Sequence, residues 1–113
     1  MSALEAILVA LSDFSYPKSP GRYEGKETKY FTYNYAADHG RDFGDDEPGC
    51  SLVTVQVHLF LPLKENFQTQ KHLIRRNLFH EGFSWPEVTV LEEDDTKMRH
   101  LIFECDYIEE LED

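Results

Sequence analysis

The chain has 113 residues, of which 41% are hydrophobic and 13% aromatic, so it is long enough to fold as one domain around its own core. Its 22 acidic residues outnumber 11 basic ones and give a formal net charge of −11. This charge argues against sequence-specific nucleic-acid binding or an anionic membrane surface, because phosphate groups repel an acidic protein. No stretch resembles a signal peptide or reaches the roughly 18 apolar residues of a membrane-spanning helix, so we expect an intracellular, non-membrane protein.

The first predicted element is a helix that begins within "SALEAILVAL", at residues 2–11. Ser2 followed by Glu5 is the pattern of a capping box. Apolar residues then recur at the helical spacing i, i+3, i+4 and i+7, which predicts one buried stripe. Its members are Leu4, Ile7, Leu8 and Leu11. Two prolines, Pro17 and Pro20, end the segment, and we expect irregular chain until about residue 28.

Two strands with clean alternation follow, "TKYFTYNYA" at residues 28–36 and "SLVTVQVHLFLP" at residues 51–62. Half-buried alternation of this kind is typical of antiparallel sheets. The fourteen-letter segment "AADHGRDFGDDEPG" separates them, where two to five residues would close a hairpin. We therefore expect a long, flexible, acidic loop at residues 37–49.

The second half of the chain repeats the order of one helix and two strands. Residues 64–82 form the predicted helix, with Gly82 as its C-terminal cap and a stripe that comprises Phe67, Leu73, Ile74 and Leu78. Residues 87–91 and 97–108 alternate as strands around the acidic turn "EEDDT". Residues 109–113, "EELED", have no apolar period and are predicted to be an acidic C-terminal tail.

The order helix, strand, strand, helix, strand, strand (αββαββ) predicts a single α+β domain over residues 1–113. The simplest way to bury every apolar stripe is one antiparallel four-stranded sheet, arranged as a meander, with both helices packed on one face.

No catalytic, cofactor-binding or metal-binding residues are predicted, and we do not expect an enzyme. The loop acids do not follow the ligand spacing of an EF-hand. The histidines lack zinc-site spacing, and Cys50 and Cys105 form neither a disulfide framework nor a C-x-x-C motif. His58 and His100 fall on outward strand positions, where they could titrate at an interface.

The basic residues are unevenly distributed, because four of the eleven lie on or beside the second helix: Lys64, Lys71, Arg75 and Arg76. In a homo-oligomer this helix could face the acidic loop of the next subunit, in a head-to-tail contact. A solvated helix face explains the same pattern.

The order of an amphipathic helix, "KYFTYNY", a long loop, "VTVQVHLF", a helix and "DDTKMRHLIFECDYIEE" resembles the small tail-completion proteins of long-tailed bacteriophages. These are also called tail terminators, tail-to-head joining proteins or minor tail proteins. The resemblance spans about Leu4 to Tyr107 and rests on order and spacing, with no catalytic signature.

The resemblance implies a hexameric ring that caps the finished tail tube and joins the tail to the head. The partners would be other copies of the chain, the tail tube protein and the head-completion or connector protein. The protein would be found in the host cytoplasm during assembly and in the virion at the head–tail junction. A neighbouring subunit would order the loop, and no cofactor is implied.

Two roles remain open for the charged residues. The loop acids could line a lumen that repels DNA, or they could contact the basic helix of the adjoining subunit. The candidate interface or lumen residues are Asp38, Arg41, Asp42, Phe43, Asp45, Asp46, Lys71, Arg75 and Arg76.

Three other functions compete with tail termination. One is a small acidic binding protein, such as a DNA mimic or inhibitor, for which size and charge are suitable. Another is a head-completion stopper protein or a tail-tube subunit. The third is a small metal-dependent hydrolase built around the loop that contains His39.

Overall fold

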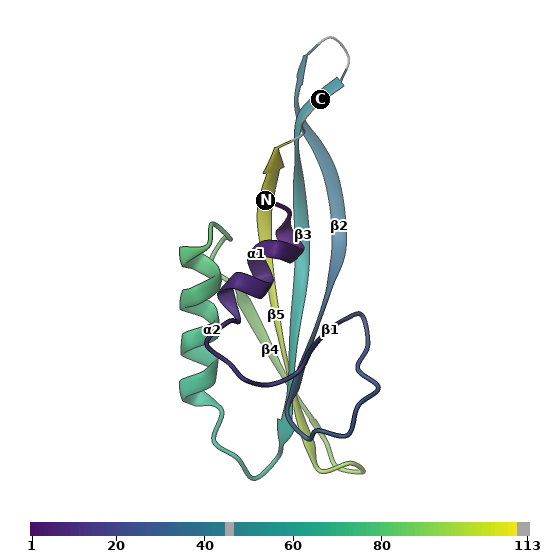
Figure 1. The fold of residues 1–113 in the computed structure, drawn as a ribbon, viewed down its shortest axis with the longest axis vertical. Coiled ribbons are helices and arrows are strands. Elements are labelled where there is room, and N and C mark those ends of the chain that lie inside the picture. Colours follow the sequence, from purple (N-terminus) through teal and green to yellow (C-terminus); the bar gives the residue numbers. More distant parts are fainter. Residues whose placement is uncertain (45–46, 111–113) are drawn as a thin grey trace.

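The computed structural model describes the backbone of residues 1–44 and 47–110, and the side chains of residues 1–40 and 49–110. Figure 1 shows a twisted sheet with two helices on one side and a narrow two-stranded extension at one end. The elements are α1 (Ala3–Ala10), β1 (Lys18–Pro20), β2 (Tyr30–Gly44), β3 (Glu47–Pro62), α2 (Gln68–His80), β4 (Glu87–Glu93) and β5 (Met98–Glu110).

The sheet has five strands in the order β1-β2-β3-β5-β4, so the prediction of four antiparallel strands was wrong in part. The additional strand, β1, runs parallel to β2, and the element order is αβββαββ. The N–H of Phe31 donates to Pro17 O at 2.8 Å, and the N–H of Gly21 donates to Tyr33 O at 2.9 Å. The prolines had indicated irregular chain, but an edge strand tolerates a residue without an N–H.

The meander was also wrong, because β5 and not β4 lies beside β3. Strand β5 occupies an interior position between β3 and β4, which is consistent with the burial of Leu101, Phe103 and Cys105 along it. Strand β4 is exposed at nearly every position and carries Glu87, Glu92 and Glu93 at the sheet edge. Charged edge strands discourage pairing with other chains.

Both helices pack on the same face of the sheet, as predicted. The core combines one side of α1 and α2 with the inward residues of β2, β3 and β5, including Phe31, Val55, Val57, Ile74 and Phe103. Asn77 joins the helices, because its Nδ2 donates to Ala10 O at 3.0 Å.

The buried side of α1 differs from the predicted stripe. Ile7 and Leu11 are buried as expected, but Leu8 is 41% exposed and Leu4 is only partly buried. The remaining buried positions are Ala3, Ala6 and Ala10. Small side chains allow the helix to lie close to the sheet, which improves packing. Hydrophobic periodicity alone does not predict this contribution of alanine.

The predicted caps are present at both helices. Ser2 and Glu5 form the capping box of α1. Gly82 follows α2 with φ +103°, its N–H donates to Phe79 O, and the N–H of Phe83 donates to Leu78 O. These two bonds form a Schellman motif, which a residue without a Cβ favours. The helix itself is shorter than the predicted 64–82.

The segment predicted as a loop at residues 37–49 is mostly strand. Pairing between β2 and β3 continues from Ala37 opposite Thr54 to Gly44 opposite Glu47, with a bulge between Tyr35 and Ala37. Backbone pairing between the two strands requires no alternation of apolar side chains, so the sequence pattern did not reveal it. Similarly, Glu109 and Glu110 belong to β5 and not to a tail, whereas residues 111–113 lie outside the described chain.

Candidate assembly surface

The extension of the β2–β3 hairpin, residues 37–44 and 47–53, is called the arm below. At the base of the arm, residues 50–53 of β3 still pair with residues 107–110 of β5, and only residues 47–49 of β3 continue beyond the end of β5 with β2 alone. The molecule measures 54 × 25 × 22 Å, and the arm projects along the long axis (Figure 1). Because β1 pairs with β2 only at residues 31–33, the outer edge of residues 34–44 has no strand neighbour within the described chain. Such an edge is a template for pairing with another chain.

A polar contact fixes the root of the arm to the body. The Tyr35 hydroxyl donates to Glu109 Oε2 at 2.6 Å, and the backbone N–H of Ala3 donates to the same oxygen at 2.6 Å. Burial, and then the hydrogen bond and negative charge of Glu109, raise the pKa of Tyr35 to about 12. One carboxylate thus connects β2, β5 and the first turn of α1.

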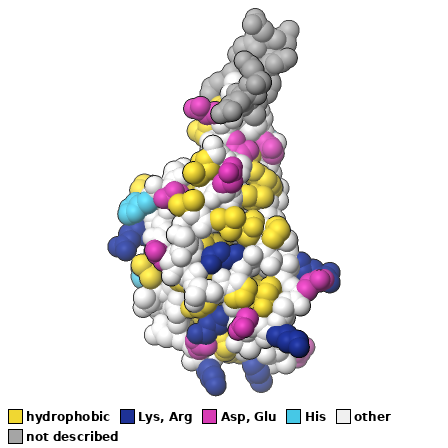
Figure 2. Space-filling view, in the orientation of Figure 1, with side chains coloured by type: hydrophobic (Ala, Val, Ile, Leu, Met, Phe, Trp, Pro, Cys, Tyr) yellow, Lys and Arg dark blue, Asp and Glu magenta, His cyan; other side chains and the backbone are white. Residues whose placement is uncertain are grey.

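Two of the predicted acidic residues, Asp38 and Asp42, lie in the β2 strand of the arm. Asp38 is exposed on β2 opposite Val53 and has no ion-pair partner within the described side chains. The backbones of Arg41 and Phe43 pair with Cys50 and Pro48, and Asp42 lies between them in β2. Asp45 and Asp46 lie outside the described residues. Figure 2 shows acidic side chains at the root of the arm and basic ones lower on the body.

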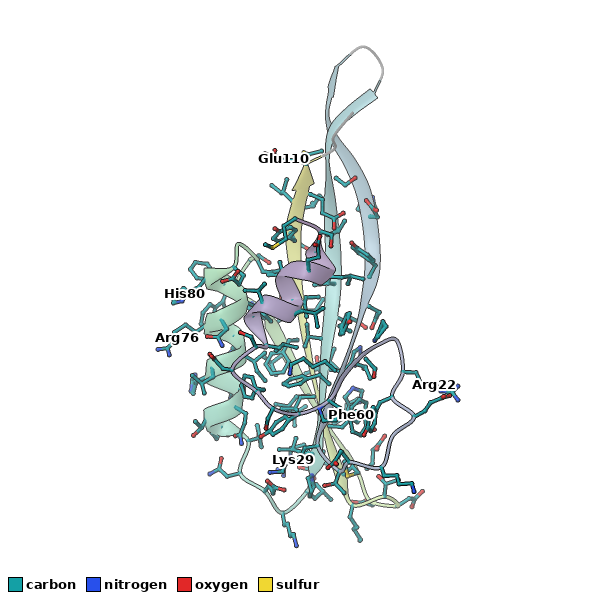
Figure 3. The ribbon with its side chains drawn as sticks, in the orientation of Figure 1. Arg22, Lys29, Phe60, Arg76, His80 and Glu110 are labelled. Atoms are coloured by element: carbon teal, nitrogen blue, oxygen red, sulfur yellow. The ribbon has the colours of Figure 1, made fainter. Side chains whose placement is uncertain are left out.

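The predicted basic residues lie on α2, beside the body and away from the arm (Figures 1 and 3). The ammonium of Lys71 lies 5.8 Å from the Phe67 ring centroid. Arg75 Nε donates to Pro86 O at 3.0 Å, and its guanidinium lies 5.4 Å from the Trp85 ring centroid. Arg76 is exposed and points away from the sheet (Figure 3). Among the described side chains, the structure therefore does not bring Asp38 together with the predicted basic residues of α2 within one chain.

An open groove lies on this outer side of α2. It has a volume of about 430 Å³ and is lined by Thr69, His72, Leu73, Arg76 and Trp85, which together are called the α2 groove below. Trp85 is 51% exposed. The adjacent Phe79 is 50% exposed and meets the Trp85 ring edge to face, at 5.7 Å between centroids.

Sequence reasoning missed both Phe79 and Trp85. A signal was present, because Trp85 is the only tryptophan and it stands in a short connection between a helix cap and a proline. Large aromatic side chains in exposed connections often mark contact surfaces.

The opposite face of the sheet carries an aromatic row that was also missed. The rings of Tyr23, Tyr30, Phe60 and His100 stack in succession, with centroid separations of 4.4, 4.7 and 4.1 Å. Phe60 lies near the end of β3 that is farthest from the arm (Figure 3). Cross-strand register explains the row, because Tyr30, Phe60 and His100 occupy matching positions on β2, β3 and β5.

His58 and His100 lie on this face, as predicted, but they are half-buried and contact each other. His58 Nδ1 lies 2.7 Å from His100 Nε2, and His58 Nε2 lies 3.1 Å from Asn34 Oδ1. Burial lowers the pKa of both imidazoles, and the charge of His100 lowers that of His58 further. The negative charge of Glu93 acts in the opposite direction on His100.

Reactive or metal-binding groups are sparse in the part of the chain that the structure describes. No group of three or more His, Cys, Asp or Glu side chains there could hold a metal ion. Burial raises the pKa of the Cys105 thiol to about 12, which suppresses its thiolate. Neither described helix is long and apolar enough to span a membrane.

No model of a known protein family matches the chain, and no curated protein matches its sequence.

Proposed function

We propose that this protein is a ring-forming structural subunit that terminates a phage or prophage tail tube and joins the tail to the head. The observation that carries the proposal is the arm, which extends beyond the end of β5 and whose β2 strand has no strand neighbour on its outer edge within the described chain. An unpaired strand edge favours aggregation in an isolated protein, but it becomes useful where another copy or partner covers it.

The charge distribution supports self-assembly of this kind. Among the described side chains, the acidic Asp38 lies on the arm, whereas the basic residues Lys71, Arg75 and Arg76 lie on α2, away from the arm (Figure 1). Contacts between two different surfaces of the same chain generate closed rings when the rotation between subunits closes. In the assembled tail the ring is a homo-hexamer that contacts the tail tube protein on one side and the head connector on the other.

The α+β architecture with two helices on one sheet face agrees with the fold that the tail-terminator resemblance implies at a coarse level. The proposed locations are the host cytoplasm during assembly and the head–tail junction in the virion. No catalytic step is part of the proposal.

Electron microscopy of particles assembled without this chain tests the function. We expect full heads and over-long tails that remain separate, and complementation with the intact gene should restore joined particles. Normal virions with tails of regular length in the absence of the chain would refute the proposal.

A further inference from the structure

The α2 groove combines one cation, Arg76, with apolar surface in an otherwise acidic protein. Helix α2 contains no Asp or Glu between Gln68 and His80, although 22 of the 113 residues are acidic. Over the same span it carries Lys71, Arg75 and Arg76, together with two histidines. The basic character of this surface is therefore a local property that the net charge conceals.

Arg76, the cation that lines the groove, has no counterion within the described chain. The described ion pairs join Arg22 to Glu24, Lys29 to Glu65, and Arg99 to Glu92. Within the described chain, Arg76 has neither an ion pair nor a hydrogen bond. A guanidinium in this state presents all five N–H donors to an incoming carboxylate.

The apolar side of the groove is rigidly placed. The Schellman motif at Gly82 fixes the chain after α2, and Pro86 is buried beyond Trp85. Arg75 then connects the helix to this segment through its bond to Pro86 O and its position over the indole ring. Exposed tryptophan beside arginine is the composition typical of interface hot spots, and preorganisation reduces the entropy lost on binding.

We propose that the α2 groove binds the tip of the arm of a second copy of this chain, residues 41–47. This segment, "RDFGDDE", has an aromatic residue, Phe43, among four carboxylates that belong to Asp42, Asp45, Asp46 and Glu47. The chemistry is complementary, because Phe43 fits the apolar wall at Leu73 and Trp85 while the carboxylates meet Arg76. The arm of the same chain projects away from α2, so the contact is between molecules and head-to-tail (Figure 1).

The inference rests on the proposed function insofar as that function requires self-assembly, but the contact can be tested without a phage. Trp85 is the only tryptophan, so intrinsic fluorescence of the full chain reports directly on the groove. Titration with a synthetic peptide of residues 40–49 should give a saturable change in Trp85 emission. Raising the salt concentration should weaken binding, since exposed charges are screened.

Two matched variants determine whether the groove is responsible. Arg76→Glu should weaken peptide binding about tenfold, because it exchanges attraction for repulsion at an exposed pair. Lys26→Glu, which makes the same change on an exposed loop away from α2, should leave binding unaltered. A variant peptide with Asn at positions 42, 45 and 46 should also bind weakly to the wild-type chain. Its affinity should be no higher than the affinity of the native peptide for the Arg76→Glu chain. Absence of a saturable change, or equal affinity for both variant chains, would overturn the inference.

Charge reversal in the full chain provides a second measurement. Sedimentation should show that Arg76→Glu alone, and Asp45→Lys with Asp46→Lys, each reduce self-association, whereas the three changes together restore it. If rings form equally well with Arg76→Glu, the contact is wrong but the proposed function stands. If the contact is verified and virions nevertheless assemble normally without the chain, the proposed function fails and the contact stands.

Discussion

The bond between Tyr35 and Glu109 offers a sharp test of how the arm is held. Removal of the hydroxyl in Tyr35→Phe leaves the ring in place and deletes one hydrogen bond to a carboxylate. Glu109→Gln removes the charge that both Tyr35 and the Ala3 N–H contact at the first turn of α1. The two substitutions therefore differ by the contact between Glu109 and the Ala3 N–H, which only Glu109→Gln weakens.

The expected magnitudes follow from exposure. A hydrogen bond to a charged group contributes about 1.5–3 kcal/mol when buried. Tyr35 is 41% exposed, so solvent screening reduces the value for Tyr35→Phe to about 1 kcal/mol. Glu109→Gln also loses a favourable charge at a helix N-terminus, about 0.3–1 kcal/mol, and should cost about 2 kcal/mol in total.

Urea denaturation of the two single variants and the double variant measures these terms. We expect lower midpoints with an unchanged m-value, and a double variant less destabilised than the sum of the single changes. Absorbance titration should show that Glu109→Gln moves the pKa of Tyr35 from about 12 toward the ordinary 10.0, but not fully, because burial remains the larger cause. Additive free energies together with an unchanged Tyr35 pKa would refute the assigned bond.

Three further predictions concern the body. Gly82→Ala should lower the free energy of unfolding by about 2–3 kcal/mol, because φ +103° lies beyond the left-handed region that L-residues reach. The control Gly21→Ala should lower it by only about 1 kcal/mol, because Gly21 has φ +73° and no atom lies within 4 Å of an added Cβ. The lowered pKa values of His58 and His100 mean that the unfolded chain binds more protons, so thermal stability should hold above about pH 6.5 and decline as the pH falls below it. A melting temperature independent of pH between 5 and 7 in the wild type, or an equal decline after both histidines are replaced by Gln, would contradict this. Alkylation mapped by mass spectrometry should leave Cys105 unmodified at pH 8 until urea unfolds the chain, since its thiol pKa is about 12; modification in the native state would contradict that burial.

Local chemistry determined the elements that the sequence predicted correctly. The capping box at Ser2 and Glu5 and the glycine after α2 each act within a few residues, so their signals are complete in the sequence. Alternation at residues 51–62 likewise reported a half-buried strand, because every second side chain enters the core. These features sufficed for the class of fold and for the placement of both helices on one face.

Only the tertiary structure decided the features that depend on distant partners. Lys18–Pro20 form a strand because β2 offers an edge, and β5 takes an interior position between β3 and β4 because its inward side chains complete the core. The arm was not predicted because its two strands are joined by backbone pairing, which requires no apolar period in the sequence. The α2 groove likewise depends on Trp85 folding back beside Arg75, ten residues from it along the chain, and no local pattern indicates that approach.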